Sequence, residues 1–191
     1  MAYVSTTKLI KPFRDYDEHN VINLFAFDGT ANKGTLVKVS TGWSNTDLNG
    51  GITAVANPHA ATYNGTVSQY HVLTPRVTDA GTGDAPIGIL LNDVRLTDEN
   101  GEFLIYKPAK AAELGAVASG QAVPILTKGT VLYAANAITA GMVAVSAANG
   151  TITGYTDATL PGANTLAQRK VVGRWLGATD SDGYALLKLD V

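Results

Sequence analysis

The chain has 191 residues, of which 46% are hydrophobic and only 16% are charged, and its formal net charge is -2 at pH 7. This length suffices for one good core or two small ones without disulfides or metals. The nearly neutral charge gives no reason to expect a nucleic acid or an anionic membrane as a partner. The sequence has no cysteine, which excludes both a disulfide framework and a thiolate site.

No apolar run approaches the roughly 20 residues of a membrane span. The first residues, Met1–Val4, lack the basic and then apolar layout of a signal peptide. We therefore expect synthesis and folding in a cytoplasm.

Residues 1–20 differ from the rest of the chain because they hold a large share of its charge. They follow neither a period of 2 nor one of 3.6, and Phe13 and Tyr16 lie among the charged side chains. We predict an extended N-terminal arm here, with a frayed terminus as the alternative. Two apolar aromatic residues favour the arm, because a fully solvated tail has no use for them.

Strand signals begin at Val21 and continue to the C-terminus. In the first half they predict strands over Val21–Phe27 and Gly34–Ser40 and a hairpin over residues 86–106. Residues 43–67 are rich in Thr, Asn, Gly and Ala with little periodicity, which indicates a long loop or insertion. Residues 21–191 are predicted to form a single β-rich domain.

The second half continues in the same manner. It predicts, in order, one short helical turn, a hairpin-like unit, a strand, a pair of strands joined by a turn, and a final hairpin. Their ranges are Ala109–Leu114, Val117–Val123, Thr130–Tyr133, Gly141–Thr153 and Lys170–Val191. Short strands separated by frequent turn signals predict an all-β fold, a small β-barrel or a sandwich built from hairpins, with at most one short helix.

The two halves also repeat each other weakly. Residues 87–91 precede the acidic Gly turn 98–101, and residues 172–176 precede the similar turn 180–183. Each copy predicts a strand, a turn and a returning strand. In the second copy Trp175 stands where the first copy has Leu90. Trp175 is therefore expected in a core or an interface.

The sequence offers no set of residues for catalysis. The three histidines, His19, His59 and His71, share no metal-ligand spacing, and no nucleophile elbow, P-loop or dinucleotide fingerprint is present. The two acidic turns suggest a calcium or acid–base site at first sight. Asp, Asn and Gly are also the residues that tight turns require, so plain turns are favoured. We predict a protein without metal, cofactor or enzymatic activity.

Several turn and strand motifs resemble the small decoration, or cement, proteins of tailed-bacteriophage heads. They lie between Ile87 and Ala134 and near the C-terminus, and the resemblance extends in pieces from about Gly34 onward. The motifs are Ile87–Leu91, Asn100–Gly101, Tyr106–Pro108, Gly120–Gly129, Val172–Gly177 and Asp182–Lys188.

The resemblance implies a β-rich structural virion protein with a β-tulip-like or barrel-like fold and without catalysis. Such a protein is made in the bacterial cytoplasm and binds the outer surface of the expanded head. It acts as a trimer or dimer and joins neighbouring major capsid subunits. The residues expected to contact the capsid are Phe13, Arg14 and Tyr16 in the arm, and Trp43 in the long loop.

Two other functions remain open on the sequence. Trp43, Tyr63 and Tyr70 could form a stacking platform in a carbohydrate- or host-surface-binding module. Alternatively, the chain could be another virion component, such as a tail-tube or head-completion protein.

Overall fold

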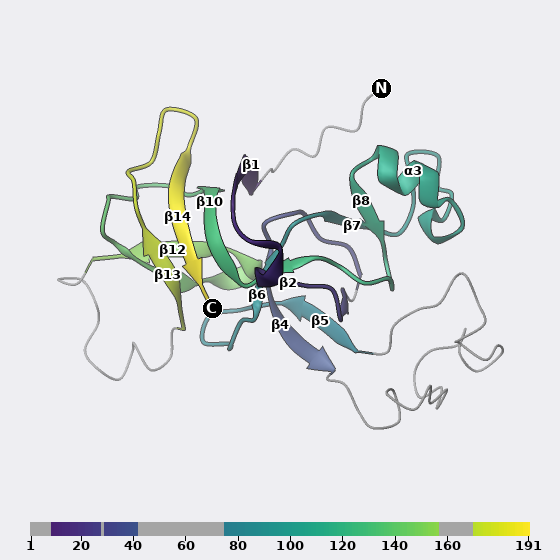
Figure 1. The fold of residues 1–191 in the computed structure, drawn as a ribbon, viewed down its shortest axis with the longest axis horizontal. Coiled ribbons are helices and arrows are strands. Elements are labelled where there is room, and N and C mark those ends of the chain that lie inside the picture. The colour runs from purple at the N-terminus through teal and green to yellow at the C-terminus, as the bar shows by residue number, and fades with distance from the viewer. Residues whose placement is uncertain (1–8, 28, 42–74, 157–169) are drawn as a thin grey trace.

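The computed structural model describes residues 9–27, 29–41, 75–156 and 170–191, with the backbone alone for residues 12–14. The described chain is almost entirely β (Figure 1), with one α-helix beside three short 3₁₀ turns. The elements are β1 (Ile10–Asp15), η1 (Glu18–Asn20), β2 (Val21–Ile22), β3 (Ala26–Phe27), β4 (Leu36–Thr41), β5 (Arg76–Asp79), β6 (Gly88–Leu90), β7 (Asp93–Arg95), η2 (Leu104–Tyr106), α3 (Pro108–Glu113), β8 (Ala116–Ala118), β9 (Ile125–Leu126), β10 (Lys128–Ala134), β11 (Val143–Ser146), η3 (Ala148–Gly150), β12 (Ile152–Tyr155), β13 (Val171–Trp175) and β14 (Tyr184–Asp190). The all-β prediction with one short helix is confirmed.

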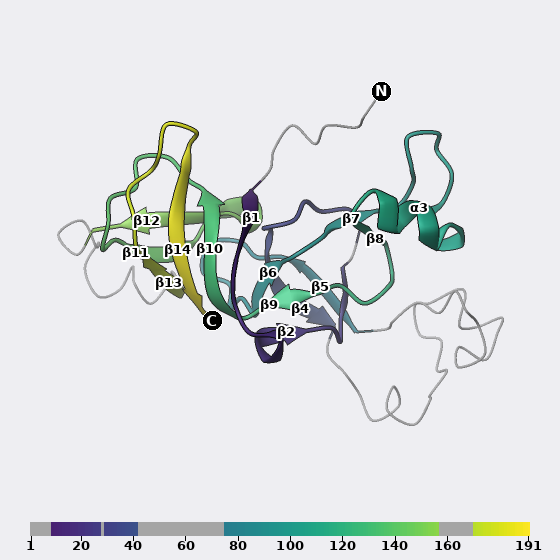
Figure 2. The ribbon, with the colours of Figure 1, turned by 45° about the horizontal axis from the view of Figure 1, so that its top comes forward.

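The strands form two six-stranded sheets and one two-stranded sheet. The C-terminal sheet has the order β1-β10-β14-β13-β11-β12, and the central sheet has the order β2-β9-β6-β4-β5-β3. Neither strand order closes on itself within the described residues, although Ala26 of β3 also bridges to Ala122 just before β9. In both views β1 lies beside β10, and the β7–β8 pair with α3 lies at the end of the molecule away from β12–β14 (Figures 1 and 2).

The two large sheets contain the same five-stranded unit twice. The first unit comprises β2, β4, β5, β6 and β9, and the second comprises β10, β11, β12, β13 and β14. Their strand orders are β5-β4-β6-β9-β2 and β12-β11-β13-β14-β10, with the members in the same order along the chain and all pairs antiparallel. The weak repeat in the sequence therefore corresponds to a duplicated topology.

The registers of the two units agree as well. In the first unit Val37 lies opposite Gly88, and in the second Ala144 lies opposite Gly173. The backbone N–H of Gly34 donates to Leu90 O at 2.6 Å, and that of Gly141 donates to Trp175 O at 2.8 Å. Trp175 thus takes the place of Leu90, as the sequence predicts. It is fully buried in the core and packs edge-to-face on Tyr133, with ring centroids 6.2 Å apart.

The central sheet is covered on both faces, which explains the unbroken apolar run in β6. Ile89 belongs to a core shared with Val131, Trp175 and Leu187 of the C-terminal sheet. Leu90 belongs to a second core that includes Val94 of β7. In β14 of the C-terminal sheet the burial alternates instead, because only one face of that sheet covers a core.

Residues 91–124 are an insertion into the first unit. They lie between β6 and β9, where the second unit has only the turn between β13 and β14. We call them the inserted module. Its strands β7 and β8 pair in parallel, and α3 and η2 pack over a small core of Leu104, Ala111 and Ala118.

Three predictions about local structure are wrong. The 86–106 hairpin does not form, because both edges of β6 pair with β4 and β9, and residues 104–106 form η2. The 117–123 hairpin is absent, because β8 extends its parallel ladder with β7 through the bond from Ser119 N to Arg95 O. The strand at 21–27 is divided into β2 and β3, which pair with different partners, β9 and β5. The 43–67 loop lies outside the described residues.

Two equivalent glycines are required where paired strands approach closely. Gly88 and Gly173 have φ of 155° and 157°. A Cβ at these positions would lie 2.3 Å from Leu126 O and 2.0 Å from Lys188 O, respectively. Any side chain there would push the neighbouring strand away.

We predict that Gly173→Ala lowers the free energy of unfolding by about 2 kcal/mol or more, through backbone strain and displacement of β14. Urea denaturation measures this loss. Gly177→Ala is the matched control, because its Cβ would meet no atom closer than 3.7 Å. Equal free energies of unfolding for the two variants would contradict the requirement for glycine at position 173.

Candidate functional site

The capsid-contact residues predicted in the arm lie on or beside β1. Phe13 and Arg14 are within β1, which pairs antiparallel with β10 and includes the buried Ile10. Tyr16 follows β1, is half-buried and packs at the edge of the main core. Residues 10–15 are thus extended, as predicted, but they belong to the C-terminal sheet. Trp43, Tyr63 and Tyr70 lie outside the described residues.

Beyond its backbone pairing, β1 contacts the last hairpin. Lys11 Nζ donates to Asp182 Oδ2 at 2.8 Å and lies 4.2 Å from the centroid of the Tyr184 ring. This hydrogen bond raises the pKa of Lys11 and lowers the pKa of Asp182. The pair joins the first strand of the described chain to the tip of the β13–β14 hairpin.

The pair should contribute to stability in a pH-dependent way. Because the pKa of Asp182 is lower in the folded state, its contribution is present above the unfolded pKa and is lost as the pH falls through the folded one. A double-mutant cycle of Lys11→Met and Asp182→Asn, followed by urea denaturation, should give a small favourable coupling near about pH 6 that vanishes near about pH 2. A coupling that persists at acid pH would contradict an ionic origin of the contact.

A hollow lies beside β7 at the base of the inserted module. Its volume is about 280 Å³, and it is lined by Thr30, Asp93, Arg95, Leu96, Thr97, Asp98, Glu99, Leu114 and Ala116. We call it the β7 pocket, because Asp93 and Arg95 project from the same face of that strand. Their alternation with the buried Val94 places both side chains on the side away from the core.

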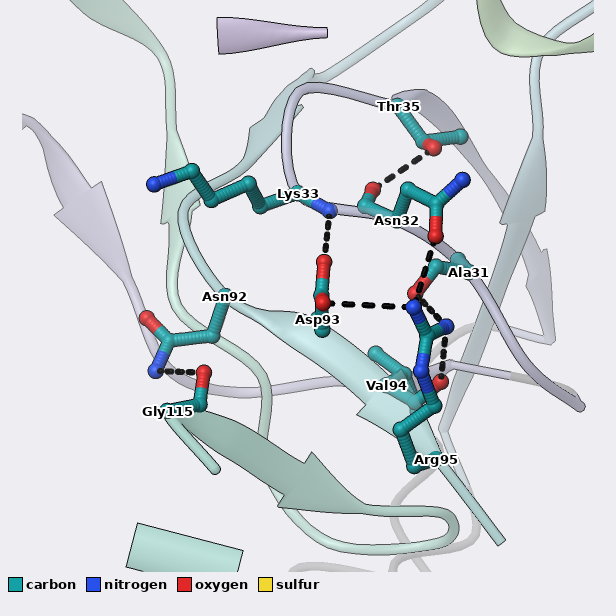
Figure 3. Close-up of polar contacts among 9 residues, drawn as sticks. All are labelled: Ala31, Asn32, Lys33, Thr35, Asn92, Asp93, Val94, Arg95 and Gly115. Atoms are coloured by element: carbon teal, nitrogen blue, oxygen red, sulfur yellow. Dashed lines mark hydrogen bonds and ion pairs between the residues drawn. The ribbon is translucent and has the colours of Figure 1, made fainter. Parts of the chain in front are cut away.

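Arg95 fixes the loop that precedes β4 (Figure 3). Its Nη1 donates to Ala31 O at 2.9 Å, and its Nη2 donates to Asn32 Oδ1 at 2.7 Å and to Asp93 Oδ2 at 3.2 Å. Asp93 in turn accepts from Lys33 N at 2.7 Å. The guanidinium is therefore already surrounded by acceptors, and it holds residues 31–33 against β7.

The other two carboxylates of the pocket lie at its rim. Asp98 Oδ1 accepts from the backbone N–H groups of Asn100 and Glu102, which closes the acidic turn. Asp180 closes the second turn in the same way, with Asp182 and Tyr184 as donors. These are the plain turns that the sequence favours over a calcium or acid–base site.

Glu99 is ionised at neutral pH. Hydrogen bonds from its own backbone N–H and from Lys110, whose Nζ is 2.9 Å from Glu99 Oε1, lower the pKa of the Glu99 carboxyl. The lining residues hold no histidine, cysteine or lysine that could act with it as a nucleophile or base. The pocket thus presents charged groups that can recognise a ligand of complementary charge.

Next to the pocket, three large apolar side chains are exposed to solvent: Leu96 at 49%, Phe103 at 51% and Tyr106 at 52%. Phe103 bridges to Thr97, and Leu104 N donates to Leu96 O at 3.1 Å, so Leu96 and Phe103 lie on neighbouring segments. Sequence reasoning missed this surface because it assigned these residues to a hairpin. The alternation of Asp93 and Arg95 was the available signal for the pocket.

No family model and no curated protein sequence matches the chain. Within the described residues, no helix is long and apolar enough to cross a membrane. The same part of the chain has no group of three or more His, Cys, Asp or Glu side chains placed to hold a metal ion.

We predict that Arg95→Lys lowers the free energy of unfolding by about 2 kcal/mol. A lysine ammonium cannot reach Ala31 O, Asn32 Oδ1 and Asp93 together, so buried acceptors lose their donor. Thermal or urea unfolding measures the loss. Lys107→Gln, which breaks the exposed pair with Glu102, should cost no more than about 1 kcal/mol. Equal losses would mean that the Arg95 network does not fix the loop.

Proposed function

We propose that this protein is a structural component of a tailed-phage virion that binds the outer surface of the expanded head and bridges neighbouring major capsid subunits. The observation that carries the proposal is the exposed apolar surface of Leu96, Phe103 and Tyr106 on the inserted module. Large apolar side chains exposed on neighbouring segments are a feature of protein–protein contact sites. The motif resemblance to decoration proteins supplies the identity of the partner.

Bridging needs contact surfaces on different sides of a rigid body. Val171, the first residue of β13, is 53% exposed, and Leu176, directly after β13, is 47% exposed. The inserted module lies at the other end of the molecule from this strand (Figure 1). Apolar side chains are thus available at both ends, and the shared core of the two sheets supports a fixed distance between them.

The physical task is consistent with such surfaces. A head that contains packaged DNA is under outward pressure, and the seams between capsomers are where it parts. Contact area across a seam resists this opening, and many copies make a modest affinity at each site sufficient. A trimer or dimer would raise the effective affinity further. In this proposal Phe13, Arg14 and Tyr16 contact the capsid from β1 and the residue that follows it.

Heads that lack the protein provide the direct test. Purified chain should bind them to saturation and raise the temperature at which the shells disrupt. Replacing Phe103 by Asp should weaken the binding by about tenfold or more, because an apolar contact becomes a buried charge. Phe103 is half exposed, so the melting temperature of the free variant should change little.

Truncation of residues 1–8 tests whether the residues before β1 contribute to binding. This truncation leaves β1 in place, whereas a deletion through residue 20 would remove β1 together with the buried Ile10. Unchanged binding after the shorter truncation would limit any arm contact to β1 and the residues after it. Absence of saturable binding by the intact chain would overturn the proposal.

A further inference from the structure

We propose that the β7 pocket and the adjoining Leu96 and Phe103 receive a protein segment that presents a lysine or arginine next to an apolar side chain. The inference deepens the proposed function, on which it rests for the identity of the partner. It assigns the chemistry of the segment that the partner offers.

The shape of the site fits one long side chain and its neighbour. The volume of about 280 Å³ exceeds what a single lysine or arginine side chain occupies, and the hollow opens beside exposed apolar residues. Leu96, Leu114 and Ala116 line it from two segments of the inserted module. These apolar atoms can pack on the aliphatic stem of a basic side chain, while the neighbouring apolar residue lies against Phe103.

The charge of the site favours a cation. Three carboxylates line the pocket, from Asp93, Asp98 and Glu99, against the single guanidinium of Arg95. Arg95 pairs with Asp93 and Lys110 pairs with Glu99, so three carboxylates face two cations and the net charge at the pocket is -1. An incoming ammonium or guanidinium would therefore meet a negative rim, and a carboxylate would be repelled.

Lys110 moderates this field without cancelling it. Its Nζ lies 2.9 Å from Glu99 Oε1 and 3.5 Å from Glu113 Oε2, so one ammonium is shared by two carboxylates. Glu99 lines the pocket and Glu113 does not. Glu99 and Glu113 therefore share Lys110 as a partner, but only Glu99 lies at the proposed site.

That pair gives a matched test on heads lacking the protein. Glu99→Lys should weaken binding by about tenfold or more at low salt, and Glu113→Lys by less than about threefold. Raising the NaCl concentration should weaken wild-type binding and reduce the difference between wild type and Glu99→Lys. Equal effects of the two substitutions would overturn the charge argument.

A second matched pair of substitutions tests the apolar part of the proposed contact. Leu96→Asn should weaken binding by about fivefold or more, whereas Leu24→Asn, at a leucine that is 54% exposed between β2 and β3, should leave it within about twofold. Thermal unfolding of each free variant controls for folding. If Leu24→Asn weakens binding as much as Leu96→Asn, the apolar contact does not lie at the pocket.

A direct probe separates this inference from the proposed function. Short amidated peptides of alternating Leu and Arg, titrated into the methyl-labelled full chain, should shift the methyl resonances of Leu96, Leu114 and Ala116 to saturation. Peptides of alternating Leu and Glu should not. Selective shifts without any head binding would refute the proposed function and retain the inference. Head binding that is unaffected by Glu99→Lys and Leu96→Asn, or shifts that do not distinguish the two peptides, would refute the inference.

Discussion

The rest of the structure depends on the close approach of paired strands at Gly88 and Gly173. At both positions the space that a Cβ needs is occupied by a carbonyl oxygen of the adjacent strand, so only glycine permits the pairing. The glycine fixes which residues of β6 and β9, or of β13 and β14, lie opposite each other. Since a shift by one residue exchanges the two faces of a strand, this register decides which side chains enter each core.

The same constraint explains why the repeat is strong in topology and weak in sequence. Equivalent positions on one face are occupied by Ile89 in the first unit and Arg174 in the second. Ile89 is buried because the C-terminal sheet covers it, whereas Arg174 lies on the uncovered face of that sheet. On the opposite face Leu90 and Trp175 are both fully buried, since both units have a core there. The two copies thus diverge where their surroundings differ and agree where the backbone leaves no choice.

Features of the fold that depend on local sequence could be predicted, and those that depend on distant strand partners could not. The all-β class, α3, the final hairpin and the burial of Trp175 follow from local patterns, and the structure confirms them. The first hairpin could not be predicted correctly, because the turn at Asp98 has the same local chemistry as that at Asp180. What differs is the strand that returns: β9 comes after an inserted module, and turn residues carry no information on such a distant partner. The β7 pocket was missed for the same reason, since the parallel pairing of β7 and β8 brings distant segments together.

The position of the insertion connects the fold to the proposed function. In the second unit the strands equivalent to β6 and β9 are joined by a short turn, so this end of the unit accepts a longer connection without disturbing the register. The first strand of the inserted module, β7, is fixed on both of its faces. Val94 packs into the core of the central sheet, and Arg95 binds the loop before β4. Leu96 directly follows these two fixed residues, so its exposed side chain has a defined position. A contact surface held this rigidly loses little conformational entropy on binding, and that is what a protein acting through contact area requires.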